Sequence, residues 1–459
     1  MRWLRVKNYL IGETKSVCPV CLKVIKAYKV EKERKDEEEI KGIFLDKTCP
    51  EHGEYSTLIW EGDATSYLAW NRENTLNDSQ FYQTDIEKGC PYDCGLCPEH
   101  KQDTCCVLLE VTNQCNLHCP VCFASAGDAV KQEPTLQEIG YYYETLMENG
   151  GPFNIQLSGG EPTMRNDLCD IIRLGREKGF SYFQLNTNGI RLGEEEALAR
   201  NLKRAGLNSV FLQFDSMTEK PYEILRGKPL FYIKEKAIEN CAKAGLGVVL
   251  VPTLVLDVNV NEIGSILQFA IDNLPDIRGV HFQPISYFGR CGLTAPQRRL
   301  TIPRVLSEIE KQTNSVMHAN DFQGGSVEHS HCSFHGNFMK QADGHIKAII
   351  GSKADCKCSS NQTREFVAKR WSAAKRCKKK EEEQEKCENG STTSLDDFLE
   401  RMEMFTLAVS GMVFQDAFNL DLERLQRCKI GEINKEGKRI PFCAYNLTSV
   451  SGKSLYRNE

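Results

Sequence analysis

Three cysteines occur with the spacing C-x3-C-x2-C in the segment TNQCNLHCPVCFAS, at Cys115, Cys119 and Cys122. Thiolates are the usual ligands of iron–sulfur clusters, and a 4Fe–4S cluster that only carries electrons takes four of them. Three thiolates leave one iron with an open position, as catalytic metal sites do for a substrate. The alternative is a structural zinc knuckle completed by His118 or by a distant cysteine.

Polar clusters follow three of the strands predicted downstream of this loop. They are SGGEP (158–162), NTNG (186–189) and the aspartate that ends LQFD (212–215). The carboxyl ends of parallel strands face one mouth of a sheet, so we expect these clusters beside the three cysteines. Paired glycines expose backbone groups there, and Glu161 can accept a hydrogen bond from an amine. A zinc knuckle would need none of these groups, which favours an open catalytic cluster.

The segment GCPYDCGLCPEHKQDTCC repeats the same spacing at Cys90, Cys94 and Cys97. Cys105 or Cys106 can supply a fourth thiolate, and a complete set predicts a closed auxiliary iron–sulfur cluster that relays electrons. Zinc is the alternative metal for this segment.

Another pair of cysteine turns lies nearer the N-terminus. The stretches VCPVC and TCPEHG provide Cys18, Cys21 and Cys49, and His52 or another cysteine would close a tetrahedral site. Zinc and a rubredoxin-like single iron both suit this donor set, and the spacing does not choose between them.

The remaining cysteines are scattered. Cys332, Cys428 and Cys443 are candidates to share a third cluster, with buried structural thiols as the alternative. Cys169 and Cys241 fall on apolar faces of predicted helices and are expected in the core. Cys377 and Cys387, in the charged run 375–390, are expected to be exposed, and Cys356 and Cys358 receive no assignment.

Short β-branched runs alternate with amphipathic stretches through the middle of the chain. Strands are predicted at 107–112, 153–158, 182–187, 209–214, 248–256 and 280–285, and helices near 135–149, 166–179, 192–205, 231–244 and 260–273. Six β–α units in succession require parallel strands with right-handed crossovers. Because a full barrel needs eight units, the pattern predicts an α/β fold with a partial (β/α)6 barrel, flanked by cysteine-rich N-terminal and C-terminal metal-binding regions.

Length and composition limit the function. A chain of 459 residues is too long for one ordinary core, and a formal net charge of −5 argues against nucleic acid as a partner. No signal peptide is apparent at the N-terminus, and 21 cysteines then favour metals over disulfides in a cytoplasmic protein. We expect a metal-knuckle region (1–75), an auxiliary iron–sulfur segment (76–106), a catalytic core (107–320) and a C-terminal cysteine-containing region (321–459) with a charged insertion near 350–395.

The cysteine loop together with GGEP resembles the radical S-adenosylmethionine (SAM) superfamily over residues 107–290. This resemblance implies that Cys115, Cys119 and Cys122 hold a 4Fe–4S cluster whose fourth iron is chelated by SAM. It also implies that SAM is contacted by Gly159, Gly160 and Glu161 at its methionine part and by Asn188 and Asp215 at its ribose and carboxylate. Reductive cleavage of SAM would then release a 5′-deoxyadenosyl radical that abstracts hydrogen from an unactivated carbon.

Further stretches extend the resemblance to nearly the full chain, among them KTCPEHG, GMVFQDAFNLDLERLQRC and IPFCAYNLTSVSGKSLYR. They are similar to the group that contains archaeal tetraether lipid synthase and the radical SAM pterin C-methyltransferase. Residues 333–395 depart from that group. The resemblance implies an enzyme with several iron centres that takes electrons from an external donor such as ferredoxin or flavodoxin.

Two reactions remain open on these grounds. Carbon–carbon bond formation on a lipid chain is the first hypothesis, and C-methylation of a reduced pterin or another small molecule is the alternative. A helix expected over 400–420 carries an apolar stripe that suits a lipid channel, although core helices carry such stripes too. A lipid substrate would also bring the protein into peripheral contact with a membrane.

Two other classes stay in view. A peptide-modifying radical SAM enzyme is disfavoured by the N-terminal knuckle. A catalytically silent iron–sulfur protein, acting as electron carrier or scaffold, would have no use for an open iron.

Overall fold

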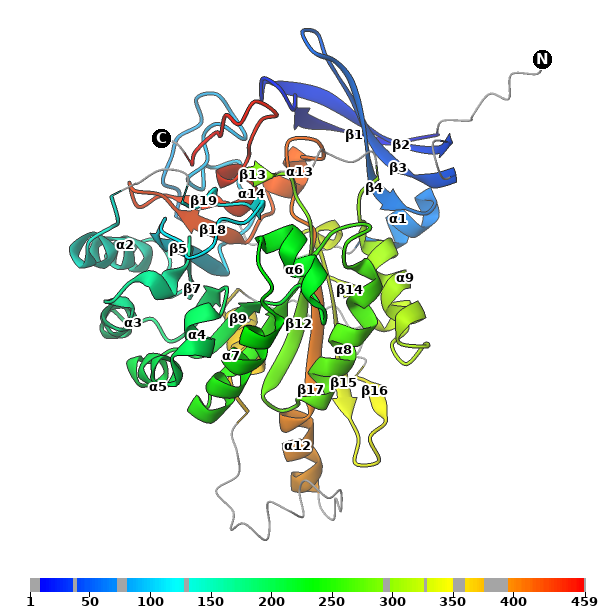
Figure 1. Cartoon of the computed structure of the whole chain (residues 1–459). Coiled ribbons are helices and arrows are strands. Elements are labelled where there is room, and N and C mark those ends of the chain that lie inside the picture. Colours follow the sequence, from blue (N-terminus) through cyan, green and yellow to red (C-terminus); the bar gives the residue numbers. More distant parts are fainter. Residues whose placement is uncertain are drawn as a thin grey trace.

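The N-terminal region folds into a four-stranded antiparallel sheet. The computed structural model describes residues 9–35, 39–71, 81–127, 132–291, 298–325, 328–349, 360–374 and 395–457. Strands β1 (Tyr9–Val17), β2 (Val24–Lys35), β3 (Glu39–Cys49) and β4 (Gly53–Glu61) pair in sequence order, followed by helix α1 (Ala64–Trp70). The sheet lies beside α9 (Ile302–Gln312), at the top of the molecule in Figure 1.

A second sheet of thirteen strands forms the body of the protein. Its order is β14 (Gln323–Gly324), β15 (Ser333–Lys340), β17 (Thr406–Met412), β12 (Ile277–Pro284), β10 (Gly247–Val251), β9 (Ser209–Gln213), β8 (Phe183–Thr187), β7 (Asn154–Gly159), β5 (Cys106–Thr112), β18 (Ile430–Ile433) and β19 (Arg439–Pro441), with β11 (Thr253–Leu254) on β12 and β16 (Ile346–Ala348) on β15. A small separate pair joins β6 (Val121–Cys122) to β13 (Arg290–Cys291).

The six predicted strands are confirmed as β5, β7, β8, β9, β10 and β12, which are parallel neighbours in this order. Pro252 ends β10 early, so the predicted strand 248–256 continues as the separate β11. The C-terminal region adds one more parallel strand at each edge: β18 pairs with β5, and β17 pairs with β12. The barrel therefore includes two strands from the C-terminal region 321–459, which the sequence analysis places outside the catalytic core.

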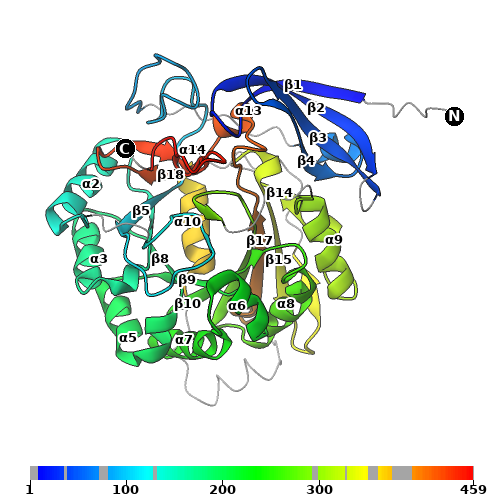
Figure 2. The same ribbon diagram turned by 45° about the horizontal axis from the view of Figure 1, so that its top comes forward.

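Helices connect the parallel strands and lie on the outer side of the sheet. They are α2 (Leu136–Glu148), α3 (Leu168–Glu177), α4 (Ile190–Glu194), α5 (Glu196–Ala205), α6 (Glu219–Arg226), α7 (Phe231–Ala244) and α8 (Ile263–Asp272). Figure 2 shows α2, α3, α5 and α7 in an arc outside the strands. Helix α6 is absent from the predicted helices, and its Pro221 lies in the first turn, where proline is tolerated.

The helix expected over 400–420 is wrong. Helix α12 (Leu395–Met404) ends before Phe405, and the next residues form β17 between β12 and β15. The stretch TLAVSGM forms a strand with a neighbour on each side, so its backbone groups find hydrogen-bond partners in β12 and β15. Pairing with the sheet therefore overrides the apolar spacing that suggested a helix. Beyond β17 come two short helices, α13 (Leu422–Leu425) and α14 (Phe442–Tyr445).

Helix α10 (Ser360–Trp371) closes the end of the barrel at which the strands begin. It contacts β10 and β12, and Asn154, at the start of β7, donates to the Arg364 carbonyl at 3.0 Å. A Cβ on Gly247, the first residue of β10, would lie 2.6 Å from the Trp371 carbonyl oxygen, so glycine permits this close approach. The opposite end of the barrel, where the strands end, carries the cysteine loop.

Candidate active site

The three-cysteine loop follows β5 and is held in place by Arg290. Strand β6, which contains Cys122, pairs with β13 so that Cys122 lies opposite Arg290. The Arg290 guanidinium donates to the Cys119 carbonyl at 2.9 Å and to the Ala126 carbonyl at 3.1 Å. One charged side chain thus fixes the middle and the C-terminal part of the loop against β13.

All three thiols line one cavity of about 490 Å³ inside the barrel. Cys119 is buried, and Cys115 and Cys122 are half-buried. Burial raises the pKa of Cys115 to about 11 and also raises the pKa of Cys119, so thiolates here call for a nearby cation. Three soft donors on one loop, open toward a cavity, fit an iron–sulfur cluster with one free iron position.

The paired glycines of SGGEP let two backbones approach closely. Gly159 has a φ of +120°, and a Cβ on it would lie 2.1 Å from the Thr112 carbonyl oxygen. A Cβ on Gly160 would lie equally close to the Gln114 carbonyl oxygen, 2.1 Å away. The amides of Gly160 and Glu161 each donate to those carbonyls at 2.8 Å. The glycines therefore lock the end of β7 against the start of the cysteine loop.

Glu161 lines the same cavity but uses its carboxylate within the protein. It is 1% exposed. Its Oε1 accepts from the Thr163 and Thr187 hydroxyls, both at 2.7 Å, and its Oε2 accepts from the Asn188 amide at 2.7 Å. Glu161 thereby ties SGGEP to NTNG at the ends of two neighbouring strands.

Asn188 also lines the cavity, whereas Asp215 lies behind Arg226. Asp215 is fully buried and accepts from Arg226 Nε at 2.7 Å and from Nη2 at 2.8 Å. Burial alone would lower the pKa of Arg226, but the Asp215 carboxylate outweighs it and raises that pKa. Arg226 faces the cavity as the last residue of α6, so it stays a cation beside Cys119. Sequence reasoning missed it because no motif marks the end of α6.

Deeper in the cavity the lining changes to amide side chains and rings. The amides are Gln156, Gln184, Asn186, Gln213 and Gln283, and the rings are Phe211, His281 and Trp371. Trp371, with Arg370, His335 and Asn337, comes from the segment 333–395. This segment therefore forms part of the cavity wall.

Cys90, Cys94 and Cys97 line a separate small cavity together with His100. The pKa of the Cys94 thiol is raised well above its usual value, mainly by a hydrogen bond with Cys90 and to a lesser extent by burial. Cys105 does not join them: it lines the barrel cavity instead, where burial raises its pKa to about 11 near Arg364 and Lys429.

Cys332, Cys428 and Cys443 are brought together in the C-terminal region. Burial raises the pKa of Cys443, and charge on Cys428 and Cys332 raises it further, so the three thiols lie within reach of one another's charge. Cys106 lies near Cys428 as well. Arg424 donates to the Cys332 sulfur at 3.3 Å. Cys106, which the sequence analysis offered as a fourth ligand for Cys90, Cys94 and Cys97, is thus a candidate to join Cys428 instead.

The N-terminal turns form a compact donor set. Ligand atoms of Cys18, Cys21, Cys49 and His52 all lie within 4.8 Å of one another. His52 Nδ1 is 3.4 Å from the Cys49 sulfur and 3.6 Å from the Cys18 sulfur. His52 is thus the fourth donor that the spacing left open.

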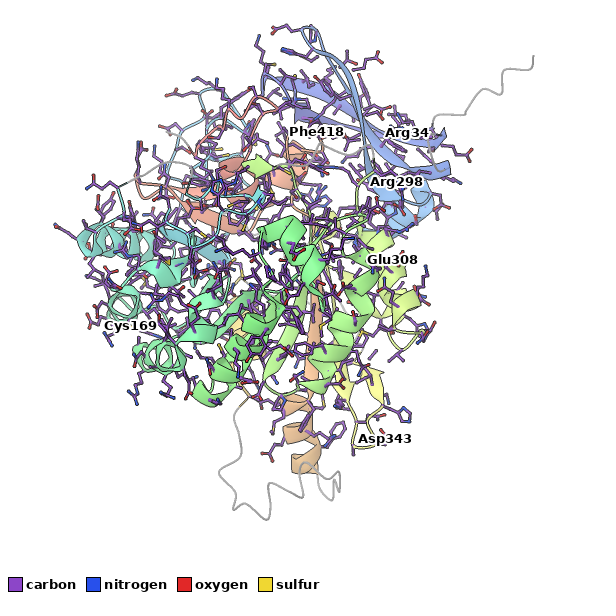
Figure 3. All side chains as sticks on the ribbon, in the orientation of Figure 1. Arg34, Cys169, Arg298, Glu308, Asp343 and Phe418 are labelled. Carbon is purple, nitrogen blue, oxygen red and sulfur yellow. The ribbon has the colours of Figure 1, made fainter. Side chains whose placement is uncertain are left out.

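The other cysteines take no part in these groups. Cys241 is buried in the barrel core, as expected, and Cys169 packs against that core from α3 (Figure 3). Cys356, Cys358, Cys377 and Cys387 lie outside the described residues, as does the charged run 375–390.

Comparison with known proteins bears on this site. The radical SAM superfamily model matches residues 109–270, and the HMPTM N-terminal zinc ribbon domain matches residues 10–61. A Methanocaldococcus jannaschii protein, 7,8-dihydro-6-hydroxymethylpterin dimethyltransferase, is 36% identical over 95% of this chain and 93% of its own length. The chain belongs to the radical SAM superfamily. It is a radical SAM enzyme, and its superfamily implies a 4Fe–4S cluster, SAM, an electron donor and a small-molecule substrate.

Other similarities are shorter or weaker. A probable GTP 3′,8-cyclase of Methanocaldococcus jannaschii is 32% identical over 39% of this chain and 59% of its own length. The crystal structure of Streptococcus suis SuiB bound to S-adenosylmethionine matches with a TM-score of 0.41 and 15% identity, over 48% of this chain and 49% of that one. Within the described residues, no helix combines the length and the apolarity needed to cross a membrane.

Proposed function

We propose that this radical SAM enzyme transfers methyl groups to carbon atoms of a reduced pterin. The full-length similarity to a 7,8-dihydro-6-hydroxymethylpterin dimethyltransferase carries the proposal. The barrel cavity is consistent with it, because amide side chains and rings line its deep part. Such a lining suits a flat heterocycle with a polar edge, and the comparisons offer no support for the lipid hypothesis.

Cys115, Cys119 and Cys122 would hold the 4Fe–4S cluster, and Gly159 and Gly160 would shape the backbone beside it. When bound there, SAM supplies a 5′-deoxyadenosyl radical on reduction. The chain's own residues bind and orient: Arg226 offers a fixed positive charge for a carboxylate, and Asn188 presents an amide at the cavity wall.

In this proposal Glu161 and Asp215 do not contact SAM themselves but position the residues that do. Glu161 fixes the two loops that form the cavity wall. Asp215 holds the Arg226 guanidinium through two hydrogen bonds. The guanidinium is therefore already oriented before an anionic group binds, and it need not move when one does.

Two auxiliary iron–sulfur centres complete the proposal. Cys90, Cys94 and Cys97 would supply three of the ligands of one, and Cys106, Cys332, Cys428 and Cys443 would hold the other. Cys105 is left out because it is not among the residues that surround Cys90, Cys94 and Cys97. The N-terminal set of Cys18, Cys21, Cys49 and His52 would hold zinc, in keeping with the zinc ribbon match, or a single iron.

The assignment of the centres is tested by iron content. Cys94→Ala and Cys428→Ala should each lower iron per chain by one cluster while SAM still binds. Unchanged iron in either variant would remove that centre from the proposal.

The substrate is tested by anaerobic turnover of the reconstituted enzyme with SAM, a reductant and 7,8-dihydro-6-hydroxymethylpterin. We expect more 5′-deoxyadenosine than without pterin. Because the SAM that is reductively cleaved keeps its methyl group on the released methionine, a product heavier by one or two methyl groups needs a separate one-carbon donor, either a second SAM molecule or an added methyl or methylene carrier. Stimulation by an isoprenoid lipid and none by pterin would overturn the proposed substrate and restore the lipid hypothesis.

A further inference from the structure

Two amide side chains of β8 point into the barrel. Along this strand Phe183 and Leu185 pack in the outer hydrophobic core, whereas Gln184 and Asn186 line the cavity. Gln184 lies opposite Gln156 on β7, and Asn186 lies opposite Phe211 on β9. Because side chains alternate between the two faces of a strand, both amides face the cavity beside residues of the neighbouring strands.

Gln184 has an acceptor without a partner. Its side chain is 0% exposed, and its Nε2 donates to Asn186 Oδ1 at 2.8 Å. Within the described part of the chain, Gln184 Oε1 has no hydrogen-bond partner. A buried polar atom left unpaired costs free energy, and native structures seldom keep one without a reason.

The pair as a whole presents one acceptor and one donor. Asn186 accepts through Oδ1, so the donor that it can offer is its Nδ2 group. Gln184 donates through Nε2, so the acceptor that it can offer is Oε1. A planar ring amide, with N–H next to C=O, is complementary to this arrangement.

Rings lie next to the pair. Phe211, across from Asn186, packs on Trp371 with ring centroids 4.7 Å apart, and His281 lies 5.8 Å from Phe211. His281 accepts or donates at Nδ1 with Ser410 at 2.9 Å, so its ring is held in one orientation. Aromatic walls beside an amide pair suit a flat heterocycle, because one contacts its face and the other its edge.

We propose that the Gln184–Asn186 pair recognises the ring amide of the substrate heterocycle. Gln184 Oε1 accepts from the ring N–H, and Asn186 Nδ2 donates to the neighbouring ring C=O. This inference rests on the proposed function, and it identifies the specificity-determining residues at that site. In a pterin the matching groups are N3–H and C4=O.

A ligand that differs only at this edge tests the inference. The probe pair is 7,8-dihydro-6-hydroxymethylpterin and its 2,4-diamino analogue, which lacks both N3–H and C4=O. Dissociation constants are measured anaerobically with the cluster-loaded enzyme and SAM, without reductant. The proteins are wild type, Gln184→Leu, Asn186→Leu and the control Gln268→Leu, whose amide is exposed on α8.

We expect the wild type and Gln268→Leu to prefer the pterin by roughly tenfold or more. Gln184→Leu should bind the pterin at least about tenfold more weakly and lose that preference. Its melting temperature shows whether it folds, since leucine removes both the unpaired acceptor and the donor to Asn186 Oδ1. Asn186→Leu, at a half-buried position, provides the same test if Gln184→Leu does not fold.

The possible failures are distinct. If Gln184→Leu and Asn186→Leu keep the wild-type preference, the inference alone is overturned. If the wild type binds neither pteridine, the proposed function falls, and the inference falls with it.

Discussion

Two groups of cysteines, one in the N-terminal ribbon and one in the barrel, show how a closed ligand set differs from an open one. In the N-terminal ribbon, three thiols and one imidazole meet within 4.8 Å, supplied by two turns of the same small sheet. In the barrel, three thiols from one loop face a cavity that also contains Arg226. The ribbon needs no further ligand, whereas the loop lacks a fourth donor of its own.

The difference assigns separate roles to the two sites. A tetrahedral set that satisfies its metal contributes to folding. A set that leaves one position open can bind and activate a cofactor, and its surroundings must then supply charge and shape. Substitutions in the ribbon should therefore lower the stability of the N-terminal sheet, and substitutions in the cysteine loop should impair SAM cleavage.

Cys122→Ala is the change with the largest expected effect. Removing one of three thiols should abolish SAM cleavage, because the cluster cannot be held in an orientation that exposes one iron. The measurement is 5′-deoxyadenosine formed anaerobically with dithionite and SAM. Cys169→Ala, on α3 outside the barrel, is the matched control and should cleave SAM normally. Turnover retained in Cys122→Ala would contradict the open-cluster assignment.

Cys49→Ala should produce the opposite pattern. Losing one of four donors should empty the ribbon and unfold β1–β4 locally, because bound metal supplies much of the folding free energy of such small units. Metal content and hydrogen exchange of the β1–β4 amides measure this. SAM cleavage should persist, and its loss to the level of Cys122→Ala would mean that the ribbon is needed for chemistry.

Arg226→Ala sharpens the description of the open site. It leaves the Asp215 carboxylate fully buried without its cation, so we expect about 3–5 kcal/mol of lost stability together with weaker SAM binding. The double variant Arg226→Leu/Asp215→Leu should recover much of the stability but not the SAM affinity. Denaturant unfolding and SAM titration separate these effects. If the double variant also recovered SAM affinity, Arg226 would have no role in binding.

The smallest effect concerns acid stability. Burial lowers the pKa of His281 from its usual 6.5 to about 4, so the folded protein keeps this ring neutral while the unfolded chain takes up a proton. The free energy of unfolding therefore falls by about 3 kcal/mol as the pH drops from 6.5 to about 4, because only the unfolded chain binds the proton in this range. His281→Asn should flatten this part of the stability profile, whereas His345→Asn, at an exposed position, should not. Identical profiles for wild type and His281→Asn would contradict this account.

Local patterns predicted the centre of the fold well. The six parallel strands and the glycine-rich ends of two of them follow from short stretches of sequence, since a strand's alternation and its turn residues are local properties. The N-terminal donor set was predictable for the same reason, because each of its two turns carries its own ligands.

Contacts between distant segments could not be predicted. Strands β17 and β18 join the barrel only through pairing with β12 and β5, which no local pattern encodes. Arg226 becomes a cavity residue because α6 ends beside Asp215, and Trp371 because α10 packs on Gly247. The same limit applies to Cys106, whose neighbour Cys428 is far away in the chain.

The most direct test of the account is 5′-deoxyadenosine formation by the anaerobically reconstituted enzyme, with and without 7,8-dihydro-6-hydroxymethylpterin. We expect SAM cleavage that needs a reductant and increases with the pterin, together with a methylated pterin. Reconstituted protein that binds iron but forms no 5′-deoxyadenosine under any of these conditions would contradict the open cluster on which the account depends.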